Sequence, residues 1–257
     1  MPITLTPFPA HPEYEGCEWT ITDVDLLAKW IAWVAVGQSY HVSNILHLAG
    51  AAPLPTNADA VKEAVKLLTQ AGKSPDHRDG WMFQIMSWLA AHKRTPNALI
   101  AAPHMIHAEK GLDGLEIILD ANQKVTGTVI FEDKATINAR STVRDLVWPE
   151  FEDFESGAAV SRMSQAAAGI LAASKHPNPS QAVSAIVWKS SKRYRLSITT
   201  KKNTLASRNS LFKGYSSSVK GAVERRRGEI FPIKDLRPWM ATLADLAIAH
   251  AKKISIT

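Results

Sequence analysis

The sequence predicts a mixed α/β fold in which one sheet is flanked by helices. Helical apolar periodicity dominates the first part of the chain, short β-branched runs occupy the middle, and a long amphipathic stretch closes it. Apolar residues make up 46% of the 257 residues, which is enough for a buried core. We expect a single domain over residues 1–257, with a mostly helical lead-in over 1–95, an α/β core over 96–200 and a basic helical part over 201–257.

Three amphipathic helices are expected in the lead-in. The first runs from Thr22 to Gly37, because Thr22 can cap its N-terminus and apolar residues recur on one face. The second extends from about Asn57 to Gly72, and the third follows Gly80. The opening third is therefore predicted to be helical.

Strands are expected in the middle of the chain. Leu115–Asp120 and Gly127–Phe131 are β-branched runs joined by the polar link Ala121–Lys124, a pattern typical of a hairpin. Val183–Trp188 and Tyr194–Thr200 have the same character, and we expect a second hairpin there.

Helices are expected around and after these strands. The Ala-rich stretch Gly157–Ser174 predicts one helix, and the amphipathic stretch Asp235–Lys253 predicts the last. Between the strands and the first of these helices, Asp145–Ser156 is acidic and aromatic, and we expect Pro149 to break it.

The composition excludes several kinds of protein. Cys17 is the only cysteine, so an internal disulfide framework and a thiolate-rich zinc site are both excluded. No stretch is long and apolar enough to cross a bilayer, and neither a secretory signal nor a P-loop sequence is visible. His104 and His107 have no partner cluster, which indicates ordinary polar histidines and not a zinc site. We therefore expect a soluble protein of the reducing cytoplasm.

Positive charge is concentrated at the end of the chain. The net charge is +6, yet residues 176–257 hold 16 Lys and Arg against 4 Asp and Glu. Such an asymmetry indicates a polyanionic partner, and nucleic acid is favoured over an acidic protein. The cations that we expect to contact phosphates are Lys189, Lys192, Arg193, Arg195, Lys213, Lys220, Arg225, Arg226 and Arg227.

The most informative residues lie where the first predicted hairpin begins and ends. Asp113 stands at the start of one strand, and Glu132 and Lys134 stand near the end of the next. Side chains two apart on a strand share a face, and facing positions of an antiparallel pair lie about 5 Å apart. The pattern therefore predicts two carboxylates and one ammonium at one place. The alternative is a solvated hairpin with a weak surface ion pair.

Such a group of side chains suits phosphodiester hydrolysis. Mg²⁺ prefers oxygen ligands and is commonly held by one or two carboxylates together with the substrate phosphate. The metal polarises the phosphoryl oxygen and lowers the pKa of its bound water, and a neighbouring lysine stabilises the charge that develops. We expect Asp113, Glu132 and Lys134 to be catalytic. Asp113, Glu132 and the carbonyl of Asp133 are the expected ligands of Mg²⁺ or Mn²⁺.

The ordered pair Gly111-Leu-Asp113 and Glu132-Asp-Lys134 resembles the core of the PD-(D/E)xK nuclease superfamily. The resemblance implies a restriction-endonuclease-like core and a magnesium-dependent deoxyribonuclease. Members often carry a further Glu, or sometimes Gln, on the preceding helix, where this chain has Gln84. In several branches the following helix supplies a Gln near the metal, and Gln165 matches that position.

The layout of the whole chain also resembles the nuclease subunit of the Hachiman anti-phage defence system. The resemblance rests on the same core, on Leu211-Phe-Lys-Gly-Tyr215 and on Arg225–Arg227. It implies an antiviral effector that cuts DNA with low sequence specificity and is restrained by a helicase partner. Two other functions stay open: an inactive nuclease-fold subunit that binds nucleic acid or docks a helicase, and an interaction protein whose basic tail docks an acidic partner.

Overall fold

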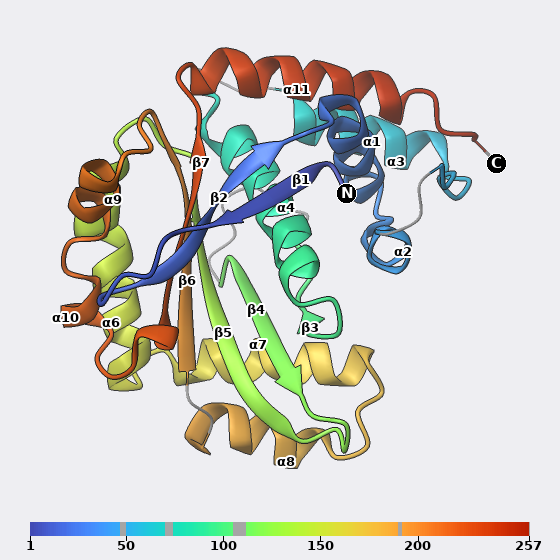
Figure 1. Cartoon of the computed structure of the whole chain (residues 1–257). Helices are drawn as coiled ribbons and strands as arrows, with labels where there is room; N and C mark the ends of the chain where they lie inside the picture. The colour runs from blue at the N-terminus through green and yellow to red at the C-terminus, as the bar shows by residue number, and fades with distance from the viewer. Residues whose placement is uncertain (47–49, 70–73, 105–111, 190–191, 257) are drawn as a thin grey trace.

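One sheet runs through the whole computed structural model, which describes residues 1–46, 50–69, 74–104, 112–189 and 192–256. Within these residues, seven strands pair in the order β1-β2-β7-β6-β5-β4-β3 (Figure 1). The strands are β1 (Ile3–Pro7), β2 (Glu15–Ile21), β3 (Leu99–Ile100), β4 (Gly114–Leu119), β5 (Val125–Lys134), β6 (Lys192–Thr200) and β7 (Arg226–Pro232). β2, β7, β6 and β5 run parallel, whereas β1, β4 and β3 are antiparallel to their neighbours. The predicted α/β class with a mixed sheet flanked by helices is confirmed.

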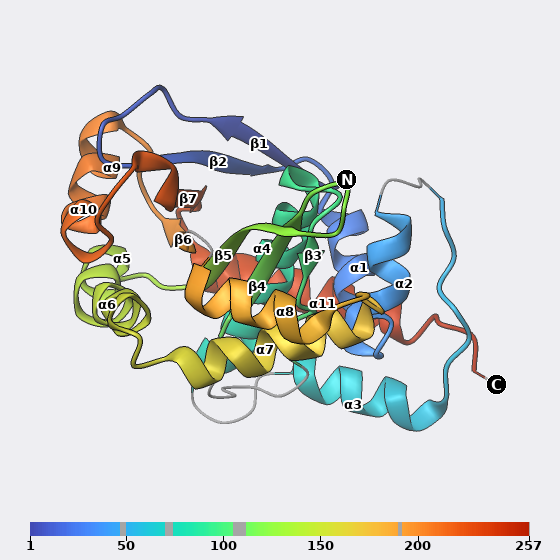
Figure 2. The same cartoon turned by 90° about the horizontal axis from the view of Figure 1, so that it is seen from below.

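Helices cover both faces of the sheet. One core contains α1 (Val24–Ala35), α2 (Ser39–Ile45), α3 (Ala58–Leu68), α4 (Asp76–Arg94) and α11 (Leu236–Ala251) with β1 and β2. The other contains α6 (Trp148–Ser156), α7 (Val160–Ala173), α8 (Pro179–Ser184), α9 (Leu205–Phe212) and α10 (Tyr215–Ser218) with β4 to β7. Figure 1 shows α11 across one end of the sheet and α7 and α8 at the other, and Figure 2 shows α7 and α8 side by side. None of the described helices combines the length and the apolar character needed to span a membrane.

The predicted helices form, with shifted ends. α1 is capped by Asp23, whose carboxylate accepts from Leu26 N at 2.9 Å, so the cap lies one residue after Thr22. α3 is capped by Asn57 as expected, while its predicted end at Gly72 lies outside the described residues. Pro149 does not break its segment. It stands in the first turn of α6, directly after the π-helical turn η1 (Val143–Val147), so the helical backbone changes its hydrogen-bond pattern where the proline lacks an N–H.

The predicted second hairpin is wrong. Val183–Trp188 lies in α8 and the π-helical turn η2 (Ala185–Lys189), and only β6 forms a strand, parallel to both β5 and β7. Short apolar runs do not distinguish a buried helix from a buried strand, and the helical alternative applies here.

The outer thirds of the chain also contain strands that were not expected. β1 and β2 belong to the first 95 residues, and β7 belongs to the last 57. β2 and β7 pair in parallel, so the two ends of the chain complete one sheet with the middle. The first third is therefore not wholly helical, and the basic C-terminal part is not either.

Candidate active site

Asp113 stands at the start of β4, where β4 meets β5. Gly114 pairs with Phe131, and a Cβ at Gly114 would lie 2.5 Å from Phe131 Cδ2. Only a glycine therefore lets β4 approach Phe131 so closely. This approach sets the position of Asp113 beside the end of β5. Gly111, the first residue of the predicted motif, lies outside the described residues.

Four side chains, which we call the Asp113 cluster, gather at this point: Gln84, Asp113, Glu132 and Lys134. Gln84, on α4, donates from Nε2 to Asp113 Oδ1 at 2.6 Å. Lys134 Nζ lies 3.5 Å from Asp113 Oδ2 and 2.6 Å from Glu132 Oε2. One ammonium thus bridges both predicted catalytic carboxylates, and Gln84 joins them from a separate helix.

Burial and like charge act strongly on Glu132. Its side chain is 2% exposed, and burial raises the pKa of its carboxyl well above the ordinary value. The nearby Asp113 charge raises this pKa further, while Lys134 opposes the rise. Burial also lowers the pKa of the Lys134 ammonium, but Glu132 and Asp113 outweigh it and leave that pKa above its ordinary value. The lysine therefore stays charged between the two carboxyls.

The carboxylate of Asp133 lies on the face of β5 opposite to the side chains of Glu132 and Lys134. Ser87 Oγ, on α4, donates to Asp133 Oδ1 at 2.6 Å, and burial raises the pKa of this carboxyl to about 7. The Asp133 N–H donates to Asp113 Oδ2 at 2.8 Å. In a strand, the N–H and C=O of one residue point to the same neighbour, so the Asp133 carbonyl also faces Asp113. Of the Asp133 oxygens, only the carbonyl therefore suits a metal beside Asp113.

The donor set fits a hard divalent cation. It consists of the carboxylates of Asp113 and Glu132 and the carbonyl of Asp133, all oxygens. Across the described ranges, no three side chains of His, Cys, Asp or Glu are grouped as a metal site. Mg²⁺, however, commonly takes only one or two carboxylates and keeps several waters. A cation here would also offset the repulsion between Asp113 and Glu132.

Two hollows flank the cluster. Asp113 lines a hollow of about 740 Å³ together with Gln165 of α7, so the two predicted residues share one space. His104 lines the same hollow, whereas His107 lies outside the described residues. On the other side, Lys134 lines a hollow of about 580 Å³ at the N-terminus of α4. The Asp113 cluster is therefore reachable from two sides.

Glu150 and Arg162 lie near the cluster without having been predicted. Glu150, in the first turn of α6, forms an ion pair with Arg162 of α7 at 3.0 Å. Its charge contributes to raising the pKa of both Glu132 and Lys134. Arg162 lines the same hollow as Asp113. Nothing local in the sequence places these residues there, because α6 and α7 reach the site only through tertiary packing.

Several predicted nucleic-acid contacts are corrected by the structure. Arg195, Arg226 and Arg227 are all buried on the sheet. Arg195 pairs with Glu229 at 2.7 Å, Arg227 pairs with Glu15 at 3.3 Å, and Arg226 donates to backbone carbonyls. Their guanidinium groups hold the sheet together and do not face solvent. These three arginines are removed from the predicted footprint.

The remaining predicted cations vary in exposure. Arg225 is half-buried and pairs with Glu155 at 2.6 Å, and Lys192 donates to the Phe154 carbonyl. Arg193 is half-buried, while Lys213 and Lys220 are exposed. The side chain of Lys189 lies outside the described residues.

Comparison with known proteins adds no relative: no family model matches the chain, and no curated protein matches its sequence. Function therefore has to be inferred from the Asp113 cluster and the surfaces beside it.

Proposed function

We propose that this protein is a metal-dependent nuclease with a restriction-endonuclease-like core, which hydrolyses DNA phosphodiester bonds with low sequence specificity. The observation that carries the proposal is the convergence of Gln84, Asp113, Glu132 and Lys134 at one strand end. These residues come from α4, the start of β4 and the end of β5. A solvated hairpin would not leave the Glu132 side chain only 2% exposed beside a bridging lysine.

Each residue of the cluster has a role in this chemistry. Asp113, Glu132 and the Asp133 carbonyl would hold Mg²⁺ or Mn²⁺, which polarises the phosphoryl oxygen and acidifies a water. Lys134 Nζ, held 2.6 Å from Glu132, is fixed to orient that water and to stabilise charge on the phosphoryl oxygens. Gln84 holds Asp113 Oδ1 in position at 2.6 Å. Gln165 lines the hollow through which the scissile strand would reach Asp113.

A second function is favoured by one specific observation. Both oxygens of Asp113 already accept hydrogen bonds, Oδ1 from Gln84 and Oδ2 from Asp133 N. The neutral side-chain amide of Gln84 and the backbone N–H of Asp133 together provide hydrogen-bond donors to the Asp113 carboxylate without a cation. An inactive nuclease-fold subunit that binds nucleic acid or docks a helicase is therefore the alternative, and the resemblance to the Hachiman nuclease supports the helicase as partner. In either function, the protein would act in the reducing cytoplasm, which is consistent with its single, buried and unpaired cysteine.

The test is cleavage of supercoiled plasmid by the purified full chain, with Mg²⁺, Mn²⁺, Ca²⁺ or excess EDTA. The proposal expects nicking or linearisation with Mg²⁺ or Mn²⁺, none with EDTA, and unproductive binding with Ca²⁺. Glu132→Gln is expected to abolish cleavage, whereas the exposed control Asp145→Asn is expected to leave it intact. Cleavage that persists in EDTA contradicts the metal mechanism. Binding without cleavage by the wild type supports the inactive alternative.

A further inference from the structure

The predicted cations at the starts of β6 and β7 lie at the opposite end of the parallel strands from the Asp113 cluster. Lys192 begins β6 and pairs with Thr128, six residues before Lys134 on β5. At about 3.3 Å per residue, this separation is about 20 Å along the strand. Arg226 begins β7 at the same end, opposite Tyr194. A DNA strand that is cut beside Lys134 would therefore contact these cations only after crossing the length of the sheet.

A basic hollow lies at the correct end instead. Its volume is about 270 Å³, and it sits where β5, β6 and β7 finish and α9 and α11 begin. The described residues that line it include four cations and no carboxylate: Arg140, Lys201, Lys202 and Lys234. Thr136, Thr199, Thr200, Ser207 and Ser210, which carry hydroxyl groups, also line it. Cations and hydroxyls together are the side chains that contact phosphate oxygens.

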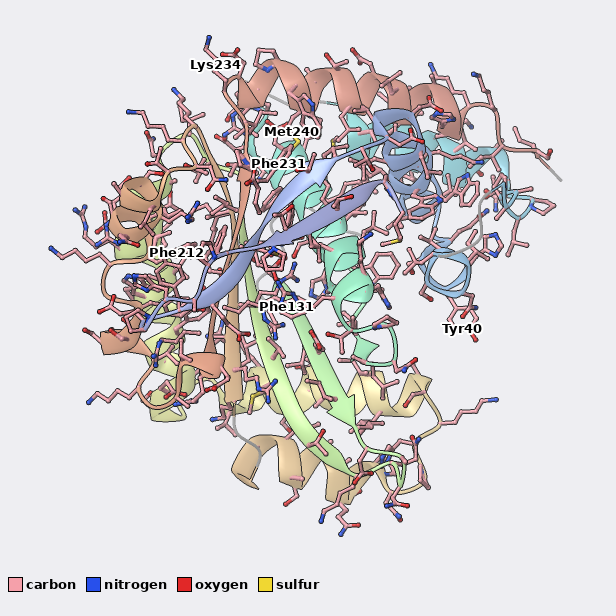
Figure 3. All side chains as sticks on the ribbon, viewed as in Figure 1. Tyr40, Phe131, Phe212, Phe231, Lys234 and Met240 are labelled. Atoms are coloured by element: carbon pink, nitrogen blue, oxygen red, sulfur yellow. The ribbon has the colours of Figure 1, made fainter. Side chains whose placement is uncertain are left out.

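The three lysines of this hollow are free to bind an anion. Lys201, Lys202 and Lys234 are exposed, and no ion pair within the described part of the chain engages them. Figure 3 shows Lys234 projecting away from the fold at the end where α11 begins. By contrast, Arg140 donates to the carbonyls of Leu211 and Lys213. The lysines are therefore the available part of the patch.

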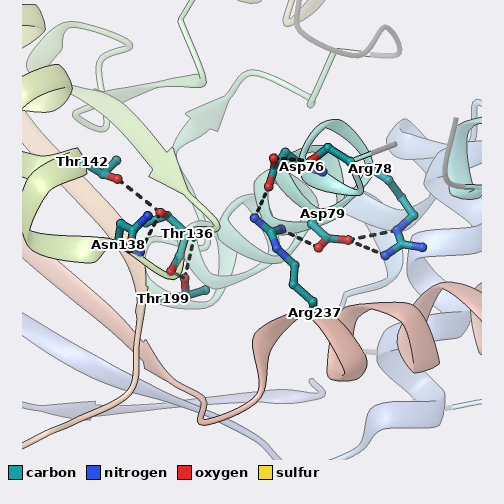
Figure 4. Close-up of polar contacts among 9 residues, drawn as sticks. Asp76, Arg78, Asp79, Thr136, Asn138, Thr142, Thr199 and Arg237 are labelled. Atoms are coloured by element: carbon teal, nitrogen blue, oxygen red, sulfur yellow. Dashed lines mark hydrogen bonds and ion pairs between the residues drawn. The ribbon is translucent and has the colours of Figure 1, made fainter. Parts of the chain in front are cut away.

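Arg237 is not part of this patch, although it lies close in sequence. It binds Asp76 and Asp79 at the N-terminus of α4, as Figure 4 shows. Arg78 pairs with the same Asp79 at 2.7 Å. These contacts tie α11 to α4 and use the charges of both arginines internally.

Backbone hydrogen bonds hold the lysines together and near the cluster. Ile233 N donates to the Thr200 carbonyl at 2.7 Å, which places Lys234 beside Lys201. Thr136 and Thr199 exchange two hydrogen bonds, at 2.8 and 2.7 Å, which join the chain after β5 to β6 (Figure 4). Thr136 lines the basic hollow and is two residues from Lys134, within about 7 Å of chain length. The hollow therefore begins about one nucleotide step from the Asp113 cluster.

We infer that Lys201, Lys202 and Lys234 bind successive backbone phosphates of the DNA strand whose scissile phosphodiester lies at the Asp113 cluster. This inference rests on the proposed function and replaces the footprint of arginines 225–227. The contacts are to phosphates, so they give affinity without reading sequence. On duplex DNA, each such contact contributes about 0.9 to the slope of log affinity against log salt.

The test measures DNA binding in a Glu132→Gln background, so that no substrate is cut. Two unrelated fluorescent duplexes are titrated at several salt concentrations. Lys201→Ala, Lys202→Ala and Lys234→Ala are combined in one variant. The control combines Lys124→Ala, Lys252→Ala and Lys253→Ala, which are exposed and lie outside the lining of the basic hollow. Both variants lose the same charge, so net charge alone cannot separate them.

The expected result is a slope that flattens by about 0.9 for each lysine of the patch, equally for both duplexes, with little change in the control. An unchanged salt slope in the variant that combines Lys201→Ala, Lys202→Ala and Lys234→Ala overturns the inference. Equal flattening of the slope in the control variant also overturns it. If polyglutamate displaces the fluorescent duplex at a lower concentration of negative charges than unlabelled DNA does, an acidic protein and not DNA is the occupant of the patch. Tighter binding of an RNA duplex than of DNA overturns it in favour of RNA.

The two proposals fail separately. If the wild type cuts plasmid but the patch variant binds normally, the lysine inference falls and the nuclease stands. If the patch governs binding but no metal supports cleavage, the nuclease falls and the binding surface stands.

Discussion

A substitution of Glu229 tests whether the buried charged residues in the basic C-terminal third stabilise the fold. The residue lies on β7, fully buried beneath α4. Its Oε2 accepts from Trp19 Nε1 at 2.9 Å and pairs with Arg195 at 2.7 Å, and its Oε1 lies 3.0 Å from Arg94. Burial alone would raise the pKa of this carboxyl, but Arg195 and Arg94 outweigh burial and lower the pKa to about 2. The ionised form is therefore the one that the folded state favours.

The magnitude follows from the two pKa values. A fall from the ordinary value of 4.5 to about 2 is worth about 3 kcal/mol, since one pKa unit equals 1.36 kcal/mol. Because the folded pKa is lowered, this stabilisation is complete above pH 4.5 and is lost as the pH falls toward 2. Glu229→Gln removes it at every pH. The variant should therefore be about 3 kcal/mol less stable than the wild type at pH 6.5, and the two should converge near pH 2.

The assay is urea unfolding at a series of pH values from 3 to 6.5, followed by tryptophan fluorescence. Asp245→Asn is the control, because Asp245 is exposed on α11 and the substitution removes the same charge. We expect the Glu229→Gln deficit to shrink steadily below pH 4.5 and the control to track the wild type. A deficit that is constant across the series, or wild-type stability of Glu229→Gln at pH 6.5, would show that Arg195 and Arg94 do not stabilise the ionised Glu229 carboxylate.

Three further predictions concern the site and the sheet. Gly114→Ala should destabilise the fold by about 1–3 kcal/mol and impair cleavage, because its Cβ overpacks against Phe131; urea unfolding at wild-type stability would contradict this. Gln84→Glu should tighten Mn²⁺ binding measured by calorimetry, because it adds a carboxylate beside Asp113, and an unchanged affinity would reject Gln84 as a neighbour of the metal. Arg226→Ala should lower the stability and leave the salt slope of DNA binding unchanged; a folded variant with a flatter slope would return the arginine to the footprint.

The parts of the site that the sequence predicts lie on one hairpin. β4 and β5 are neighbours in sequence, and their β-branched runs and polar turn give a local signal. Asp113, Glu132 and Lys134 all belong to this hairpin, so their proximity follows from local pairing. Gln84 reaches Asp113 from α4, 29 residues earlier, and only the family resemblance indicated it.

The parts that the sequence does not predict depend on long-range pairing. β7 contains Arg226, Arg227 and Glu229, and such a charged run is typical of an exposed segment. It becomes a central strand because Glu15 and Arg195 arrive from β2 and β6 to neutralise it. The hairpin predicted for β6 is antiparallel, whereas β6 runs parallel to β5 and β7. Because of this parallel arrangement, the Lys201 end of β6 adjoins the Asp113 cluster and the Arg226 end of β7 does not.

In the proposed function, Asp113 and Glu132 hold the divalent cation on which DNA cleavage depends. The most direct measurement is the single-turnover rate of plasmid cleavage as a function of Mn²⁺ concentration, for the wild type and for Asp113→Asn. We expect the wild-type rate to saturate with Mn²⁺. Asp113→Asn should need at least about 10-fold more metal and should cut more slowly even at saturation. Identical metal dependence in the two proteins, or no cleavage by the wild type at any Mn²⁺ concentration, would contradict the proposed function.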